Sequence, residues 1–221
     1  MKIGAQLMSE GSLNKTLYFV FLCLLSTLIT YAAKSLLITE DLYFQFFGDQ
    51  LSYERIAEII YLNEKWDWVS YAIIPAYYLI KIFLVGVCIY IGSLLIGIDI
   101  SFKKIFQATL LAEGIFLIPG IFRLIWFLFI QTHYTFSDIQ HFYPLSVLNF
   151  FDPASLEAWW IYPLQLLNIF EVLYLFALAY GLYVITTKSY VKMLTLIACS
   201  YGAGLFIWVA SITFLTVSFS A

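Results

Sequence analysis

Three ionisable residues, Lys81, Glu113 and Glu171, stand inside long apolar stretches of the sequence. A lysine and two carboxyl groups that meet in an apolar interior can neutralise and hydrogen-bond one another, which fastens together the segments that carry them. They can also form a relay that passes protons or ions through a membrane. Both interpretations stay open. In the first, a structural staple, Lys81 neutralises one glutamate and the other is protonated or hydrogen-bonded; the second is a proton or ion relay.

A second polar set lies between residues 131 and 158, a stretch without Lys or Arg, and comprises His133, Asp138 and His141. Histidine and carboxylate side chains are common metal ligands, but this spacing matches no standard zinc pattern. We therefore expect surface polar residues here, with a metal or ligand site as the alternative. The sequence contains no HExxH, GxSxG, P-loop or Rossmann glycine motif, so we predict a protein without catalytic residues, resident metal or cofactor.

The composition requires a lipid environment for the segments that hold these residues. Of the 221 residues, 63% are hydrophobic and only 11% are charged, against about 45–50% and about 25% in soluble domains. A water-soluble fold could not hide so much apolar surface. The net charge of −3 offers no basic face to nucleic acid. Membrane lipids are therefore the first expected partners.

Apolar periodicity predicts an all-α, polytopic transmembrane bundle with about five spans, each long enough to cross about 30 Å of hydrocarbon. A short segment, 1–16, precedes a single transmembrane domain, 17–221. Between the first two spans, apolar residues at helical spacing over 51–60 predict an amphipathic helix on the membrane surface. The five predicted spans are 17–37, 69–96, 105–130, 159–185 and 193–217.

The distribution of Lys and Arg predicts the orientation, because short cytoplasmic loops collect these residues. The N-terminus and the two short turns are then cytoplasmic, and both long loops and the C-terminus lie outside. Asn14-Lys15-Thr16, a glycosylation sequon, falls on the cytoplasmic side and is taken as chance. The cytoplasmic set is Lys2, Lys15, Lys103, Lys104, Lys188 and Lys192.

This orientation brings the three intramembrane residues to similar depths. Counting the rise along each span puts Lys81 and Glu171 about 18 Å from the outer face, and Glu113 about 16 Å from it. Arg123 lies nearer the outer interface, where its long side chain can reach the headgroups. The sequence therefore predicts an intramembrane polar cluster of Lys81, Glu113 and Glu171, with Arg123 as a separate charge at the outer interface.

Two stretches resemble the Yip1-like family of five-span membrane proteins. One is Gly97-Ile-Asp-Ile-Ser-Phe-Lys-Lys-Ile-Phe106, continuing through Ala112-Glu113 to Pro119-Gly120. The other combines Leu148-Asn-Phe-Phe-Asp152 with Phe170-Glu-Val-Leu-Tyr174, Ala179-Tyr-Gly-Leu182 and Ser189-Tyr-Val-Lys192. The resemblance covers roughly residues 70–217 and implies a cytoplasmic N-terminus and closely packed spans. The short N-terminal segment and the long acidic loop 39–68 depart from the family, so the likeness is to a bacterial-type member in the cytoplasmic (inner) membrane.

Three functions follow as hypotheses. The first is a non-enzymatic scaffold or accessory subunit that contacts other membrane protein subunits and lipid, because the sequence contains no catalytic motif and no sizeable soluble domain. The second is a small transporter or proton- or ion-translocating subunit that uses Lys81, Glu113 and Glu171. The third is an intramembrane enzyme that acts on lipid with the histidines of the outer loop, His133 and His141.

Overall fold

A computed structural model describes residues 12–186 and 188–220 of the chain. The predicted segment 1–16 and its Lys2 lie largely outside the described residues. Within the described part, the regular elements are all helical, apart from one isolated bridge between Ser146 and Asn168. The predicted all-α bundle is confirmed.

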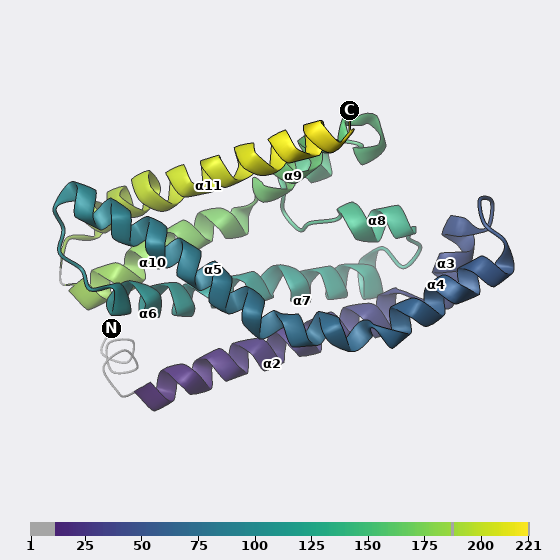
Figure 1. Cartoon of the computed structure of the whole chain (residues 1–221), viewed down its shortest axis with the longest axis horizontal. Helices are drawn as coiled ribbons and strands as arrows, with labels where there is room; N and C mark the ends of the chain where they lie inside the picture. The colour runs from purple at the N-terminus through teal and green to yellow at the C-terminus, as the bar shows by residue number, and fades with distance from the viewer. Residues whose placement is uncertain (1–11, 187, 221) are drawn as a thin grey trace.

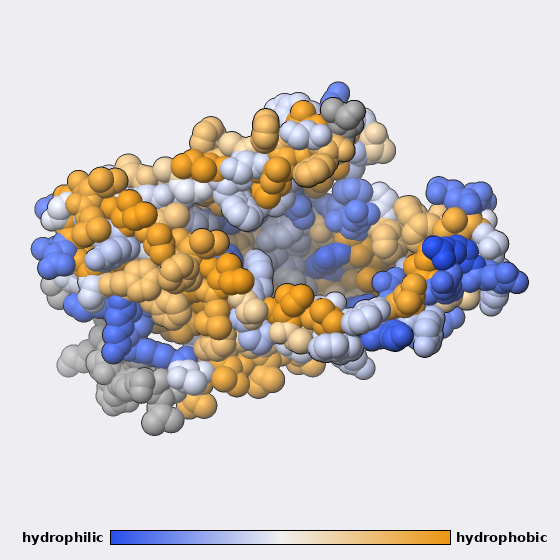
Figure 2. All heavy atoms as spheres, in the orientation of Figure 1, coloured by the Kyte–Doolittle hydropathy of each residue, from blue (hydrophilic) through white to orange (hydrophobic). Residues whose placement is uncertain are grey.

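In the described part of the chain, five helical segments are long and apolar enough to cross a membrane. They are α2 (Ser12–Leu37), α5 (Asp67–Ile96), the interrupted stretch Phe102–Ile130, α10 (Ile169–Thr186) and α11 (Tyr190–Ser220). A helix satisfies its own backbone polar groups, which lipid cannot do. On the face that Figure 2 shows, side chains along the spans are mostly hydrophobic, and hydrophilic residues gather mainly towards the two ends. This arrangement is that of a multi-pass membrane protein.

The two short turns, between α5 and α6 and between α10 and α11, lie at the end of the bundle where α2 begins (Figure 1). The C-terminus lies at the opposite end, together with the long loops. Gly97 ends α5 in a left-handed conformation, with φ 73°, that a residue with a side chain seldom adopts. The basic residues of both turns therefore share one end, as the predicted orientation requires; which compartment that end faces stays a prediction.

The first long loop contains two helices, α3 (Glu40–Phe47) and α4 (Tyr53–Lys65), that project beyond the spans (Figure 1). The amphipathic helix expected over 51–60 corresponds to α4. Ser52 caps it, accepting a hydrogen bond from the backbone N–H of Arg55 at 3.4 Å. Helix α3 was not expected, because its eight residues are too short to show a helical period.

The third span is irregular rather than one α-helix. It consists of α6 (Phe102–Ala112), a 3₁₀ turn η1 (Glu113–Phe116), α7 (Leu117–Ile125) and a π-helical turn η2 (Trp126–Ile130). Such turns inside helices frequently mark functional or strained positions. The change from α to 3₁₀ geometry occurs at the ionisable residue Glu113.

The predicted fourth span, 159–185, is wrong as a single helix. It is divided into α9 (Ala158–Leu166) and α10 (Ile169–Thr186), both of which pack on α11. The preceding loop contains α8 (Phe136–His141) and two short 3₁₀ turns, η3 (Val147–Phe150) and η4 (Pro153–Ser155). Part of this loop reaches the break between the two helices.

The largest buried cluster lies among α5, α6, α10 and α11, with Ile89, Ile105, Leu178 and Met193 at its centre. A smaller cluster joins α2 to α5 and α6, and a third joins the outer end of α2 to η2 and α8. The first cluster is on the cytoplasmic side of the ionisable residues in the predicted orientation. This cluster packs together the helices that position Lys81, Glu113 and Glu171.

Candidate functional site

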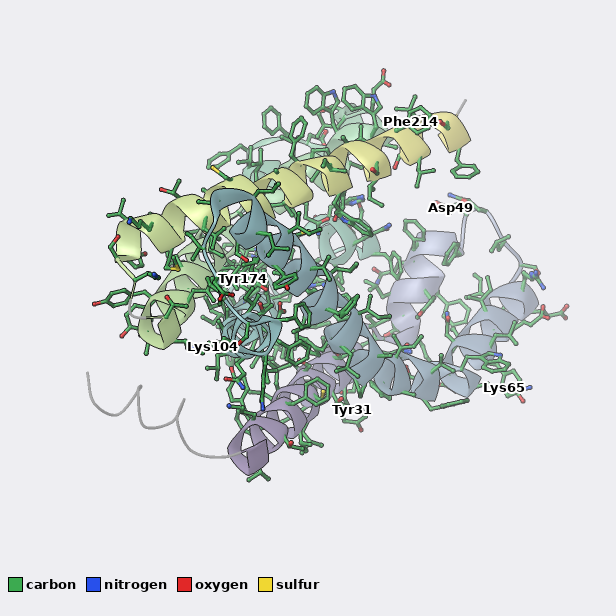
Figure 3. All side chains as sticks on the ribbon, turned by 60° about the vertical axis from the view of Figure 1, so that its left-hand side comes forward. Tyr31, Asp49, Lys65, Lys104, Tyr174 and Phe214 are labelled. Atoms are coloured by element: carbon green, nitrogen blue, oxygen red, sulfur yellow. The ribbon has the colours of Figure 1, made fainter. Side chains whose placement is uncertain are left out.

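The centre of the bundle holds a buried ion pair between Lys81 on α5 and Glu113 on η1. The Lys81 Nζ and Glu113 Oε2 atoms are 2.8 Å apart, and the Glu113 side chain is 0% exposed. Tyr174 on α10 donates to the other carboxylate oxygen, Oε1, at 2.6 Å. Figure 3 shows Tyr174 within the bundle, between the ribbons of the surrounding helices. Each oxygen of Glu113 therefore has a donor from a different helix.

The ammonium group of Lys81 also lies over an aromatic ring. Its Nζ is 3.5 Å from the ring centroid of Phe116 and 5.3 Å from that of Tyr174. A cation over the face of a ring is attracted by the ring quadrupole, more strongly where water is excluded. Phe116 ends the same 3₁₀ turn that Glu113 begins. One turn of backbone thus supplies both groups that stabilise the charge of Lys81.

The local backbone explains how Glu113 reaches this position. The switch to 3₁₀ geometry alters the hydrogen bonding of the preceding carbonyl groups. Tyr18 on α2 donates to the carbonyl of Leu111 at 3.1 Å. An unpaired carbonyl would be costly in lipid. The contact from α2 therefore stabilises the irregular turn that presents Glu113.

The second carboxyl group, Glu171, lies in the first turn of α10 and is buried. Tyr201 on α11 donates to its Oε1 atom. The backbone N–H of Glu171 donates to the side-chain oxygen of Asn168 at 2.9 Å. The rings of Tyr174 and Tyr201 pack edge to face, with centroids 5.5 Å apart. The two carboxyl groups are therefore linked through two tyrosines in contact, and the set ties α5, η1, α10 and α11 together.

Backbone contacts from the preceding loop close the break between α9 and α10. The N–H of Val147 donates to the carbonyl of Leu167 at 2.9 Å, and the N–H of Ile169 donates to the carbonyl of Leu145 at 3.4 Å. Leu145 adopts a left-handed conformation, with φ 55°. Non-helical backbone at membrane depth is tolerated where protein covers it. Residues 145–147 provide that cover.

A cavity of about 810 Å³ adjoins this polar centre. It is lined by residues of α5, α9, α10 and α11, and the molecule is hollowed between α11 and α5 (Figure 2). Lys81, Gln165, Asn168 and Glu171 are among its polar lining. Tyr143, in the loop, also lines it, and burial together with the nearby Glu171 raises the pKa of Tyr143 to about 12. The volume of the cavity falls in the usual range for ligand pockets.

The outer charges lie apart from this centre. Arg123 donates to the carbonyl of Ile139 in α8, and its Nε atom is buried without a partner. Asp138 forms a capping box with Thr135, and His141 is hydrogen-bonded to Ser137. His133 is exposed. Among the described residues, no group of three or more His, Cys, Asp or Glu side chains lies close enough to hold a metal ion.

The structure thus brings Lys81 and Glu113 into contact. It connects Glu171 to Glu113 through the packed rings of Tyr174 and Tyr201. Tyr174 and Tyr201, which donate hydrogen bonds to the two carboxyl groups, were not predicted from the sequence. Their positions could have indicated them, because tyrosine favours the membrane interface, whereas both of these residues lie well inside spans. Tyr174 also stands three residues after Glu171, on the same face of the helix.

No protein-family model, curated protein or solved structure matches this chain. The function is therefore inferred from the site itself.

Proposed function

We propose that this chain is a non-enzymatic membrane protein that serves as a scaffold or accessory subunit of a larger membrane assembly. We further propose that it is a Yip1-like protein, on the resemblance described above, and that it lies in the cytoplasmic membrane of a bacterium. The observation that carries it is the pairing of Lys81 with Glu113, completed by Tyr174. These groups satisfy one another across three helices, which is the behaviour of a staple.

The energetics of buried ion pairs support this interpretation. A charge at the membrane centre costs at least about 2–3 kcal/mol even on the mildest scales. Removing one partner of a buried pair is strongly destabilising, because the other is left uncompensated. Lys81 and Glu113 offset this cost through an ion pair, a phenol and an aromatic ring. A set so completely paired holds helices in one arrangement.

The projecting outer part supports a role in assembly. Helices α3 and α4 extend beyond the spans, and Figure 3 shows Asp49 and Lys65 on this projection, away from the bundle. On α4, Tyr53 is 73% exposed and Tyr61 is 62% exposed. Exposed aromatic side chains outside the lipid region are frequent anchors in protein interfaces. We take this projection as the surface that docks on a partner.

Affinity purification in mild detergent tests the proposal. Tagged protein should recover partner proteins in stoichiometric amounts. Tyr61→Ala, on the projection, should lower their recovery. Phe214→Ala, which truncates an aromatic residue 70% exposed on α11, is the matched control and should leave recovery unchanged. If the protein is a monomer without partners both in detergent and in lipid nanodiscs, the assembly role is rejected.

The break in the fourth span favours transport as a second candidate. Discontinuous helices that border a cavity near the membrane centre are a feature of secondary transporters, and α9 and α10 meet beside the cavity that Lys81 and Glu171 line. Proteoliposomes loaded with a pH-sensitive dye should then show proton flux that falls in Glu171→Gln. Equal flux in wild type and in the variant, or in wild type and in empty liposomes, would exclude the relay. A variant that loses its fold instead would favour the staple.

A further inference from the structure

We propose that the cavity between α5 and α11 binds amphipathic organic cations, whose ammonium or phosphonium centre pairs with Glu171. This inference goes beyond the proposed function, because a scaffold and a transporter could each carry such a site. It rests on the charge balance of the polar centre, on the free oxygen of Glu171 and on the aromatic and apolar lining of the cavity.

The charge balance leaves one carboxyl group without a cation. Lys81 is the cation of the centre and forms its ion pair with Glu113. Glu171 has no salt-bridge partner among the described residues. Its one hydrogen-bonded side-chain oxygen accepts a hydrogen bond from the phenol of Tyr201, which is uncharged. A cation that enters the cavity favours the ionised form of Glu171, and with both carboxyl groups ionised the centre has a net charge of −1, so a cation is favoured over an anion.

Glu171 is placed to meet a ligand. It is 93% buried (relative exposure 7%), yet it lines the cavity together with Tyr201. Its second carboxylate oxygen, Oε2, has no hydrogen-bond partner in the described structure, whereas both oxygens of Glu113 do. A buried carboxylate with an unused oxygen gains most from a partner that brings a compensating charge.

The lining suits the rest of such a molecule. Tyr77, Tyr143, Tyr162 and Trp208 contribute aromatic rings around the cavity, and aromatic cages recognise quaternary ammonium groups. The hydrogen bond from Trp208 Nε1 to the Tyr162 hydroxyl, at 2.8 Å, joins α11 to α9 and fixes two of these rings. Ile80, Leu84 and Leu205 add apolar surface to the lining. The ligand is therefore cationic at one point and apolar elsewhere.

The experiment uses two hydrophobic ions of nearly equal shape and opposite charge, tetraphenylphosphonium and tetraphenylborate. Their binding to the purified full chain in detergent is measured by calorimetry. We expect wild type to bind the phosphonium, and Glu171→Gln to bind it at least about tenfold more weakly, because a buried charge partner is lost. The borate should bind no more weakly to the variant than to wild type. Equal loss of both ions, or no loss of either, would overturn the proposal.

Two further variants separate binding from folding. Leu84→Trp fills the cavity without altering the polar centre, and Leu79→Trp adds the same ring to α5 at a similarly exposed residue outside the lining. The first should abolish phosphonium binding and the second should not. If Glu171→Gln does not fold, this pair decides alone: identical binding by both variants would reject the site.

Discussion

Lys81 and Glu113 are 32 residues apart in the sequence, yet their side chains meet at 2.8 Å inside the bundle. Neither residue could stay ionised there by itself, because an isolated charge in an apolar medium is far less stable than in water. Their pairing therefore fastens α5 to the third span.

The ion pair should show strong coupling in a double-mutant cycle. Lys81→Met and Glu113→Gln should each lower the free energy of unfolding by about 3–5 kcal/mol, because each leaves a buried group uncompensated. The double variant should lose much less than the sum. Unfolding in detergent by denaturant titration measures all three. Additive losses would show that the two side chains do not depend on each other.

The tyrosines should matter through their hydroxyl groups. Tyr174→Phe removes the donor to Glu113, and Tyr201→Phe removes the donor to Glu171, with no change in ring size. A hydrogen bond to a charged group contributes about 1.5–3 kcal/mol, so the melting temperature should fall in both variants. Tyr180→Phe, on the exposed side of α10, is the control and should melt like wild type. A similar melting temperature for all three variants would contradict the network.

Two glycines of α11 provide a matched test of helix packing. A Cβ atom on Gly204 would lie 2.8 Å from the sulfur of Cys88 on α5, whereas one on Gly202 would meet nothing within 4 Å. Gly204→Ala should therefore destabilise the bundle by forcing α5 and α11 apart. Gly202→Ala should be neutral or stabilising by up to about 1 kcal/mol, because alanine favours the helix. Thermal unfolding distinguishes the two variants. If Gly202→Ala were the less stable one, α11 would pack against α5 with a different face.

The fold follows from the sequence where the signal is local. Long apolar runs predict the five spans, and the ends of the second and fifth agree with the helices to within a few residues. The break between α9 and α10 has only a weak local signal, because Asn168 is a residue type that begins helices but stands in a long, mainly apolar stretch that favours one continuous span. It exists because Leu145 and Val147, about 20 residues earlier, hydrogen-bond the interrupted backbone. A contact so distant in sequence leaves no periodicity to detect.

The candidate site was predictable in its charges and not in its hydrogen bonds. Lys81, Glu113 and Glu171 were found because ionisable residues are rare inside spans. Counting the rise along the helices predicts similar depths for the three residues, and the structure puts Lys81 in contact with Glu113 and joins Glu171 to them through Tyr174 and Tyr201. Which glutamate pairs with Lys81 depends on the 3₁₀ turn at Glu113. Gly114 and Pro119 favour an irregular turn here, because glycine weakens a helix and proline removes a hydrogen-bond donor, and Tyr18 on α2 donates to the carbonyl of Leu111 just before the turn.

Cysteine labelling should establish the orientation. Lys103 in α6 and Gln140 in α8 are exposed, and the turn before α6 and the loop that contains α8 lie towards opposite ends of the bundle (Figure 1). After the native cysteines are replaced by alanine, Gln140→Cys should react with a membrane-impermeant maleimide in intact cells. Lys103→Cys should react only after lysis, because basic turns are held in the cytoplasm. Labelling of both residues in intact cells would place them in one compartment and contradict a membrane-spanning bundle.

Asn168 should control the break in the fourth span. Its side-chain oxygen caps α10 by accepting from Glu171, and its amide group donates to the carbonyls of Gln165 and Leu166 at 3.1 and 3.0 Å. Asn168→Ala removes both functions and should cost about 1–2 kcal/mol for the cap alone. Asn168→Ser keeps a capping oxygen and loses the amide, so it should recover part of that loss.

Hydrogen exchange reports on this segment directly. The amide of Val147, which pairs with Leu167 across the break, should exchange faster in Asn168→Ala than in wild type, and at an intermediate rate in Asn168→Ser. Peptides from the middle of α5 should be unaffected, which separates local opening from global unfolding. If the two variants exchange at equal rates, the amide donors rather than the cap hold the two helices in register. If neither differs from wild type, the loop backbone alone maintains the break, and the position of Glu171 is independent of its capping residue.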